Sequence, residues 1–176
     1  MTNIPELKPL SMTARQMRDA GACYDLQTIK GLWDGRESLT ALDILDLGIP
    51  DADKLWGVLR ENLIPASGLR ELACRFAETA LVGEVAAGGA PDARSYAVIE
   101  VARAFANGDA TEDQLAAASS AASSAAWAAE SSAAWAAARA ENSATWAAAS
   151  SAAAAAEINI IREYLQKFAL DREATK

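Results

Sequence analysis

The chain of 176 residues contains no histidine at all. This absence removes the commonest general base of enzymes, the usual activator of a serine or cysteine nucleophile, and the commonest metal ligand of proteins. The sequence also lacks a glycine-rich loop with the Lys-Ser/Thr ending that cradles phosphates. Two acidic pairs, Asp43-x-x-Asp46 and Asp51-x-Asp53, offer oxygen ligands, but neither has the glycine and terminal glutamate of a calcium loop. We therefore expect a non-enzymatic protein without a cofactor or a metal ion.

Cysteine is nearly absent, since Cys23 and Cys74 are the only two. They do not form the spacing of a disulfide framework or a zinc site, so we expect two free and buried thiols, as in a cytosolic protein. Residues 1–10 lack the basic start and apolar run of a signal peptide, and the alanine-rich run is interspersed with serine, glutamate and arginine. These features predict a cytoplasmic protein that does not cross a membrane.

Basic residues are outnumbered, with 16 lysines and arginines against 24 acidic residues and a formal net charge of −8. A general nucleic-acid binder needs a basic surface to displace counterions from the phosphates, so this charge argues against nucleic acid as the partner. Between Gly31 and Asp53 the acidic residues face Arg36 alone. These candidate partner-binding residues are Asp34, Glu37, Asp43, Asp46, Asp51 and Asp53. Such a patch favours a basic protein partner, and a solvated helical face without a partner is the alternative.

Neither glycine nor proline occurs after Gly108. Residues 116–156 instead hold 24 alanines, nine serines and three tryptophans in 41 positions. Alanine is the best helix former, so this composition predicts helix from about residue 111 to residue 170. A straight helix of that length would measure roughly 90 Å, more than twice the width of a compact domain. The segment is therefore expected to fold back as a hairpin, with a break at 141–143, or to project as a rod.

Three tryptophans in this run, Trp127, Trp135 and Trp146, fall on one side of a helix, within about 100° of one another. An aromatic stripe of this kind is more typical of a core than of a ligand site. We expect it to pack against the helices that carry Phe76 and Phe105. Together with Trp33 and Trp56, these aromatic side chains are expected to anchor a core that is otherwise thin, because alanine buries little area.

Shorter helices are predicted before this run from apolar side chains at helical spacing. They cover residues 13–19, 23–30, 40–47, 51–62 and 69–80, with Trp33 in a turn and a glycine-rich loop over 83–91. Asp92 is expected to cap the next helix, Asn107-Gly108 to end it, and Thr111 with Gln114 to open the alanine-rich segment as a capping box. No stretch predicts a β-strand.

The predicted fold class is all-α, a compact multi-helix bundle with a long alanine-rich helix or helical hairpin in its C-terminal half. Residues 1–10 are expected to be a flexible lead-in. Residues 11–176 are expected to form a single domain, made of N-terminal helices over 11–82 and the alanine-rich helical half over 92–176.

The segment 92–111 has a distinctive order of residues. It reads Asp92-Ala93-Arg94-Ser95, then Ile99, Ala102-Arg103, Phe105 and Asn107-Gly108-Asp109-Ala110-Thr111, before the alanine-rich run. This order resembles the alanine-rich immunity protein family of bacterial polymorphic toxin systems, whose relatives also occur in phage genomes. A looser match in the N-terminal half comprises Cys23, Trp33, Leu55-Trp56 and Leu72-Ala73-Cys74. The resemblance implies a small cytoplasmic protein that neutralises a toxin by binding it, without catalytic residues.

The leading functional hypothesis is therefore an inhibitor that covers the active site of a cognate, basic toxin with its acidic surface over 34–53. One alternative is a phage accessory or anti-defence protein that binds a host protein complex. Another is a structural protein that forms homo-oligomers through its alanine-rich surface. Arg94 is a further candidate contact, because the first turn of a helix is an unusual place for a cation. Its alternative role is an internal salt bridge, to Glu100 or to a carboxylate of another helix.

Overall fold

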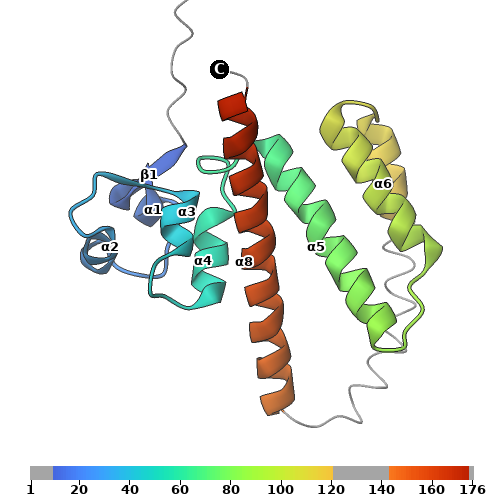
Figure 1. The fold of residues 1–176 in the computed structure, drawn as a ribbon, viewed down its shortest axis with the longest axis horizontal. Helices are drawn as coiled ribbons and strands as arrows, with labels where there is room; N and C mark the ends of the chain where they lie inside the picture. Colours follow the sequence, from blue (N-terminus) through green and yellow to red (C-terminus); the bar gives the residue numbers. More distant parts are fainter. Residues whose placement is uncertain (1–9, 121–142, 175–176) are drawn as a thin grey trace, which may run out of the picture. The chain divides into compact units, whose positions relative to one another are not determined.

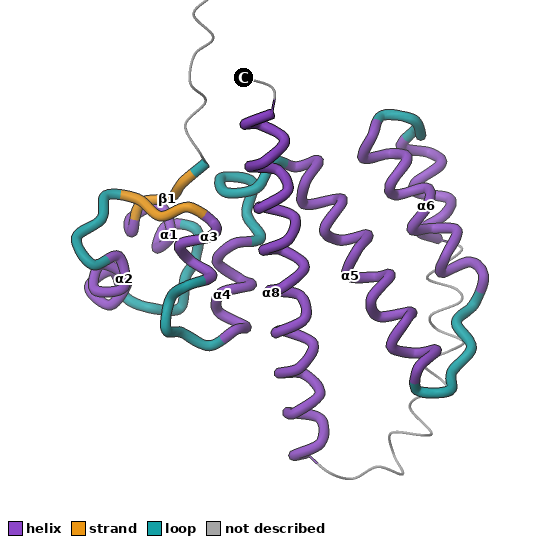
Figure 2. The backbone as a smooth tube through the Cα atoms, viewed as in Figure 1, coloured by secondary structure: helices purple, strands orange, loops and turns teal. Residues whose placement is uncertain are grey.

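The computed structural model describes residues 10–120 and 143–174, and over 143–151 and 168–174 it describes the backbone alone. These residues are mostly helical, with one small two-stranded sheet (Figures 1 and 2). The all-α class is therefore confirmed, and the sheet is an element that the sequence analysis did not predict. The chain divides into two compact units, the first made of Met1–Ala66 with Ala154–Lys176 and the second of Ser67–Ala153.

The chain passes between the units at Ala66 and again at Ala153. The division that the sequence predicts, at 83–91, falls inside the second unit. That residues 11–176 form one domain stays a prediction. The lead-in predicted over residues 1–10 lies outside the described residues except for Leu10, which is exposed.

The first unit contains most of the short elements. They are β1 (Ser11–Thr13), α1 (Ala14–Asp19), α2 (Leu26–Trp33), β2 (Ser38–Thr40), α3 (Ala41–Leu45), α4 (Asp51–Val58) and the later part of α8 (Ser143–Ala174). The second unit contains α5 (Ala66–Ala86) from its second residue onward, α6 (Ala93–Asn107), a helical segment over 112–120 and the start of α8.

A short sequence motif occurs twice in the first unit, 27 residues apart. Ser11-Met12-Thr13-Ala14 and Ser38-Leu39-Thr40-Ala41 each form a strand that leads directly into a helix. The two strands pair antiparallel around Met12 opposite Leu39, and both of these side chains are fully buried. In both copies the threonine caps the following helix through a capping box, Thr13 with Gln16 and Thr40 with Asp43. The repeat thus gives the unit a local two-fold arrangement centred on the Met12–Leu39 pair.

The second capping box is formed by Thr40 and Asp43 at the start of α3. The Asp43 backbone N–H donates to the Thr40 hydroxyl oxygen, and the Asp43 carboxylate accepts from the Thr40 backbone N–H at 2.8 Å and from its hydroxyl at 2.6 Å. The hydroxyl bond is the largest cause that holds the pKa of Asp43 below its ordinary value of 3.8. The local sequence therefore fixes both the start of α3 and the ionisation of its first carboxylate.

Substitution Thr40→Val is expected to lower the free energy of unfolding by about 1 kcal/mol at neutral pH, since the side chain keeps its shape but loses the cap. A carboxyl with a lowered pKa stabilises the fold above its unfolded pKa, and this contribution is lost as the pH falls through the folded value. The difference from wild type should accordingly shrink in urea titrations below pH 3.8. The control is Thr79→Val, whose exposed hydroxyl donates only to Arg75 O within α5. Equal losses in the two variants would contradict the capping role.

Trp33 is the last residue of α2 and is buried, so its predicted place in a turn is wrong. The helix continues through Gly31 because Trp33 packs inward, where its indole Nε1 donates to the carbonyl of Met12 at 3.1 Å. The contact joins α2 to the sheet strand β1. The core of the first unit is built around this tryptophan together with Ile29, Ile44 and Leu45.

The later part of α8 belongs to the first unit, and its residues Ile158 and Ile161 are both buried. Arg162, the next position, donates to the Leu45 carbonyl at 2.9 Å and to the Asp46 carboxylate at 2.7 Å. The end of α3 is thereby held by a residue from the far end of the sequence.

The alanine-rich segment is only partly described. Thr111 and Gln114 form the predicted capping box, and helix follows over 112–120. Residues 121–142 lie outside the described residues, together with Trp127, Trp135 and most of the expected break at 141–143, and so does the side chain of Trp146. The choice between a hairpin and a rod therefore stays a prediction.

In the second unit α5 and α6 lie side by side and run in opposite directions (Figure 1). The Cys74 thiol donates to the Ile99 carbonyl, and Glu71 forms an ion pair with Arg103. In α5, Leu72 and Cys74 are buried while Ala73 is exposed. The helix also continues past the glycine at 83, where helix propensity over the flanking residues outweighs the cost of one glycine. Asp92 caps α6, and the helix ends at Gly108, which adopts the left-handed conformation. Both predicted ends of this helix are therefore confirmed.

Candidate functional site

The first unit contains a pocket of about 270 Å³. Its walls are mainly apolar and come from α1, α2, α3, α4 and the segments between them. The principal apolar lining residues are Met17, Ile29, Trp33, Ile44, Leu47 and Ile49. Several of these are core residues, so the pocket is a continuation of the core that opens at its edge.

Polar groups in the lining are Cys23, Tyr24 and Asp53. The Tyr24 hydroxyl donates a short hydrogen bond to Asp53 Oδ2, which ties the segment before α2 to α4. This bond raises the pKa of Tyr24, first because ionisation would remove the donor and then because a phenolate would face the carboxylate. Tyr24 therefore stays neutral, and Asp53 is the lining residue that carries a charge at neutral pH.

Trp56 and Gly57 of α4 form another part of the lining. A Cβ at Gly57 would lie 3.3 Å from Ile44 Cγ2, so the missing side chain allows α4 to approach α3 closely. Trp56 is 38% exposed, which corrects its expected role as a core anchor. The Arg60 guanidinium lies over its ring at 3.8 Å from the centroid. An aromatic ring is thus left accessible beside an apolar pocket.

The acidic residues predicted as a partner surface are largely engaged within the chain. Asp43 pairs with Arg36 at 3.2 Å, Asp46 with Arg162 at 2.7 Å and Asp51 with Lys54 at 3.1 Å. These exposed and half-exposed pairs satisfy each carboxylate locally, which reduces the charge that the segment presents.

The other three candidates differ in their surroundings. Asp53 lies in the pocket lining, whereas Asp34 and Glu37 are exposed. Asp34 ends α2 in the left-handed conformation, with φ of 48°. The structure therefore brings one of the six predicted acidic residues, Asp53, to a cavity.

Arg94 pairs with Asp92, the cap of its own helix, through contacts of 2.8 and 2.9 Å. The same arginine lowers the pKa of Asp92 to about 2, because its side chain and backbone N–H groups both donate to the carboxylate. The predicted internal salt bridge thus exists with a different partner, since Glu100 pairs with Arg103 instead. Arg94 belongs to the second unit and does not line the pocket.

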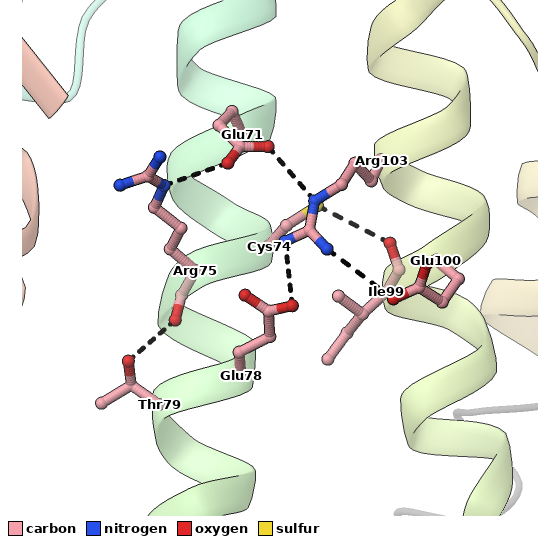
Figure 3. Close-up of polar contacts among 8 residues, drawn as sticks. All are labelled: Glu71, Cys74, Arg75, Glu78, Thr79, Ile99, Glu100 and Arg103. Carbon is pink, nitrogen blue, oxygen red and sulfur yellow. Dashed lines mark hydrogen bonds and ion pairs between the residues drawn. The ribbon is translucent and has the colours of Figure 1, made fainter. Parts of the chain in front are cut away.

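A polar cluster joins α5 to α6 around Arg103 (Figure 3). The guanidinium lies 2.9 Å from Glu78, 3.4 Å from Glu71 and 3.7 Å from Glu100. Cys74 is buried between the two helices, and burial raises the pKa of its thiol, which stays protonated at neutral pH. The expectation of two buried thiols is wrong for Cys23, which is exposed. We interpret the Arg103 cluster as a joint between helices, because each of its charges has an opposite charge beside it.

Comparison with protein-family models, curated proteins and solved structures yielded no match. The resemblance carried by residues 92–111 therefore remains a prediction. Over the part of the chain that the structure describes, three or more acidic or cysteine side chains nowhere gather as metal ligands would. No helix among the described residues combines the length and apolarity needed to span a membrane. The sequence did not indicate Tyr24 as a residue of the site. The local sequence pattern also gave no sign that Trp56 would be exposed.

Proposed function

We propose that the protein is a non-enzymatic inhibitor of the immunity type, which binds a cognate protein toxin and neutralises it by covering part of its surface. The observation that supports binding is the apolar pocket of the first unit, with the Asp53 carboxylate and the exposed Trp56 ring in its lining. The order of residues over 92–111 supports the immunity type.

The pocket supports a protein partner because interface energy concentrates where one anchoring side chain fills a desolvated pocket. Aromatic rings such as Trp56 are enriched at such places, since they offer a large apolar area at little cost in conformational entropy. The acidic segment contributes at longer range, because a net charge of −8 accelerates encounter with a basic protein. The contact surface in this proposal is therefore centred on the pocket and not spread evenly over residues 34–53.

Photo-crosslinking from the pocket tests this function. The variant Trp56→p-benzoylphenylalanine keeps an aromatic side chain at the pocket, and the matched control places the same probe at Val82, an exposed residue of α5 in the second unit. In the native host, the probe at 56 is expected to capture one protein at least about tenfold more efficiently than the probe at 82, as expected for a hot-spot position. That protein, once purified, should lose its toxic activity when the wild-type chain is added.

Other results would separate the alternatives. Capture of a host complex without toxic activity would favour a phage accessory protein, and crosslinks between copies of the chain would favour self-association. Capture that is equal from both probe positions would contradict a pocket-centred interface. A neutral probe is preferable to charge reversal of the acidic segment, because reversal at Asp43 or Asp46 would also remove the internal pairs of α3.

A further inference from the structure

The size of the pocket limits what it can hold. Pockets for drug-sized ligands usually measure about 300–1,000 Å³, and this one, at about 270 Å³, lies below that range. The volume suits one long side chain that enters from the partner's surface.

The charge of the lining narrows the choice further. No lysine or arginine lines the pocket, and Asp53 is its one carboxylate. The Tyr24 hydroxyl donates to Oδ2 of this carboxylate, which leaves Oδ1 as an acceptor for a second donor. Among the described residues, Tyr24 supplies the recorded side-chain hydrogen bond to this group. A carboxylate or phosphate from a partner would be repelled here, whereas a cation would complete a charge-assisted hydrogen bond.

Lysine and arginine side chains match both features of the pocket. Their aliphatic stems can lie along the walls formed by Ile29, Ile44 and Leu47, while the charged head reaches Asp53. A neutral aliphatic or aromatic side chain would fill the walls but would add no donor to the Asp53 carboxylate beyond the Tyr24 hydroxyl.

We propose that this pocket recognises a single lysine or arginine side chain of the protein partner, with Asp53 as the residue that selects for its charge. The inference rests on the proposed function for the identity of the partner. The chemistry of the pocket itself is a property of the free chain and can be tested without any partner.

The test uses fragments that imitate the side chain, added to the full-length protein labelled with ¹⁵N. The probes are n-butylguanidinium, its neutral counterpart n-butylurea, and butyrate, and binding is followed through the indole N–H resonances of Trp33 and Trp56. Saturable shifts are expected with n-butylguanidinium, with about tenfold weaker binding of n-butylurea, because a hydrogen bond to a charged group is lost. Butyrate should cause no saturable shift.

Two isosteric variants assign the effect to one carboxylate. Asp53→Asn is expected to weaken n-butylguanidinium binding about tenfold, since it removes the charge but keeps an acceptor for Tyr24. The control Asp51→Asn lies on the same helix, pairs with Lys54 and does not line the pocket, so its affinity should stay within roughly twofold of wild type.

Equal affinity for n-butylguanidinium and n-butylurea would overturn the proposal, as would an unchanged affinity in Asp53→Asn or the absence of saturable shifts. The comparison of the two fragments is made on the wild-type chain and stands even if a variant fails to fold. If n-butylguanidinium does not bind but crosslinking from position 56 succeeds, the cation selectivity of the pocket is rejected and the proposed function is not. The reverse pattern would reject the proposed partner while leaving a cation pocket.

Discussion

Replacing Trp33 by alanine is expected to lower the free energy of unfolding of the first unit by about 3–5 kcal/mol. The side chain is 3% exposed, and its removal leaves a large cavity among the core residues that surround it. It also leaves the Met12 carbonyl without its indole donor at the point where β1 meets α2. Since whole domains are stable by about 5–15 kcal/mol, a loss of this size would unfold a substantial fraction of the unit.

Hydrogen exchange measured by mass spectrometry can localise this loss to β1, β2 and α2, and urea titration by circular dichroism gives its size. Trp33→Phe should lose about 1–3 kcal/mol, because the ring remains but a buried carbonyl loses its partner. Trp56→Ala is the matched control in the same unit. Trp56 is 38% exposed, so this variant should lose clearly less than Trp33→Ala, because part of the side chain already contacts water. Equal losses in Trp33→Ala and Trp56→Ala would contradict the described packing.

Ile161→Ala is expected to cost about 2–5 kcal/mol of the same free energy. Ile161 is fully buried in the first unit, although it lies close to the end of the sequence in α8. Its neighbour Arg162 holds the Leu45 carbonyl and the Asp46 carboxylate. A cavity at 161 should therefore also loosen the end of α3, visible as faster exchange of its amide protons.

The control for this second substitution is Ile160→Ala, which removes the same atoms from the adjacent and partly exposed position. It is expected to cost less than half as much, because part of its side chain already contacts water. Thermal unfolding of the two variants, followed by circular dichroism, makes the comparison. Similar losses at 160 and 161 would indicate that α8 docks through a different face.

Signals that depend on residues three or four apart were predicted well. The caps at Asp92 and Thr111 and the helix end at Gly108 all occur where the sequence predicts them. Each depends on a side chain and a backbone group within one helical turn, so tertiary contacts scarcely influence it. The strands were missed because three-residue segments are too short to show an alternating pattern, although the repeated Ser-apolar-Thr-Ala motif was a signal for them.

Long-range features of the candidate site could not be read from the sequence. Asp53 was among the predicted acidic residues, but nothing local indicated that Tyr24, 29 residues earlier, would hold its carboxylate. The sequence predicts that Asp46 is available to a partner, but in the fold it pairs with Arg162, 116 residues later. The acidic segment thus carries less unpaired charge than its composition suggested.

The sequence by itself determined the helical class, the helix caps, the acidic balance and the absence of histidine, because composition and contacts within one turn decide these properties. Only the tertiary structure decided which tryptophan is buried, which carboxylates are paired and where a pocket opens. Those outcomes depend on which helix faces pack together. The residues in such contacts are far apart along the chain, so no local sequence pattern indicates them.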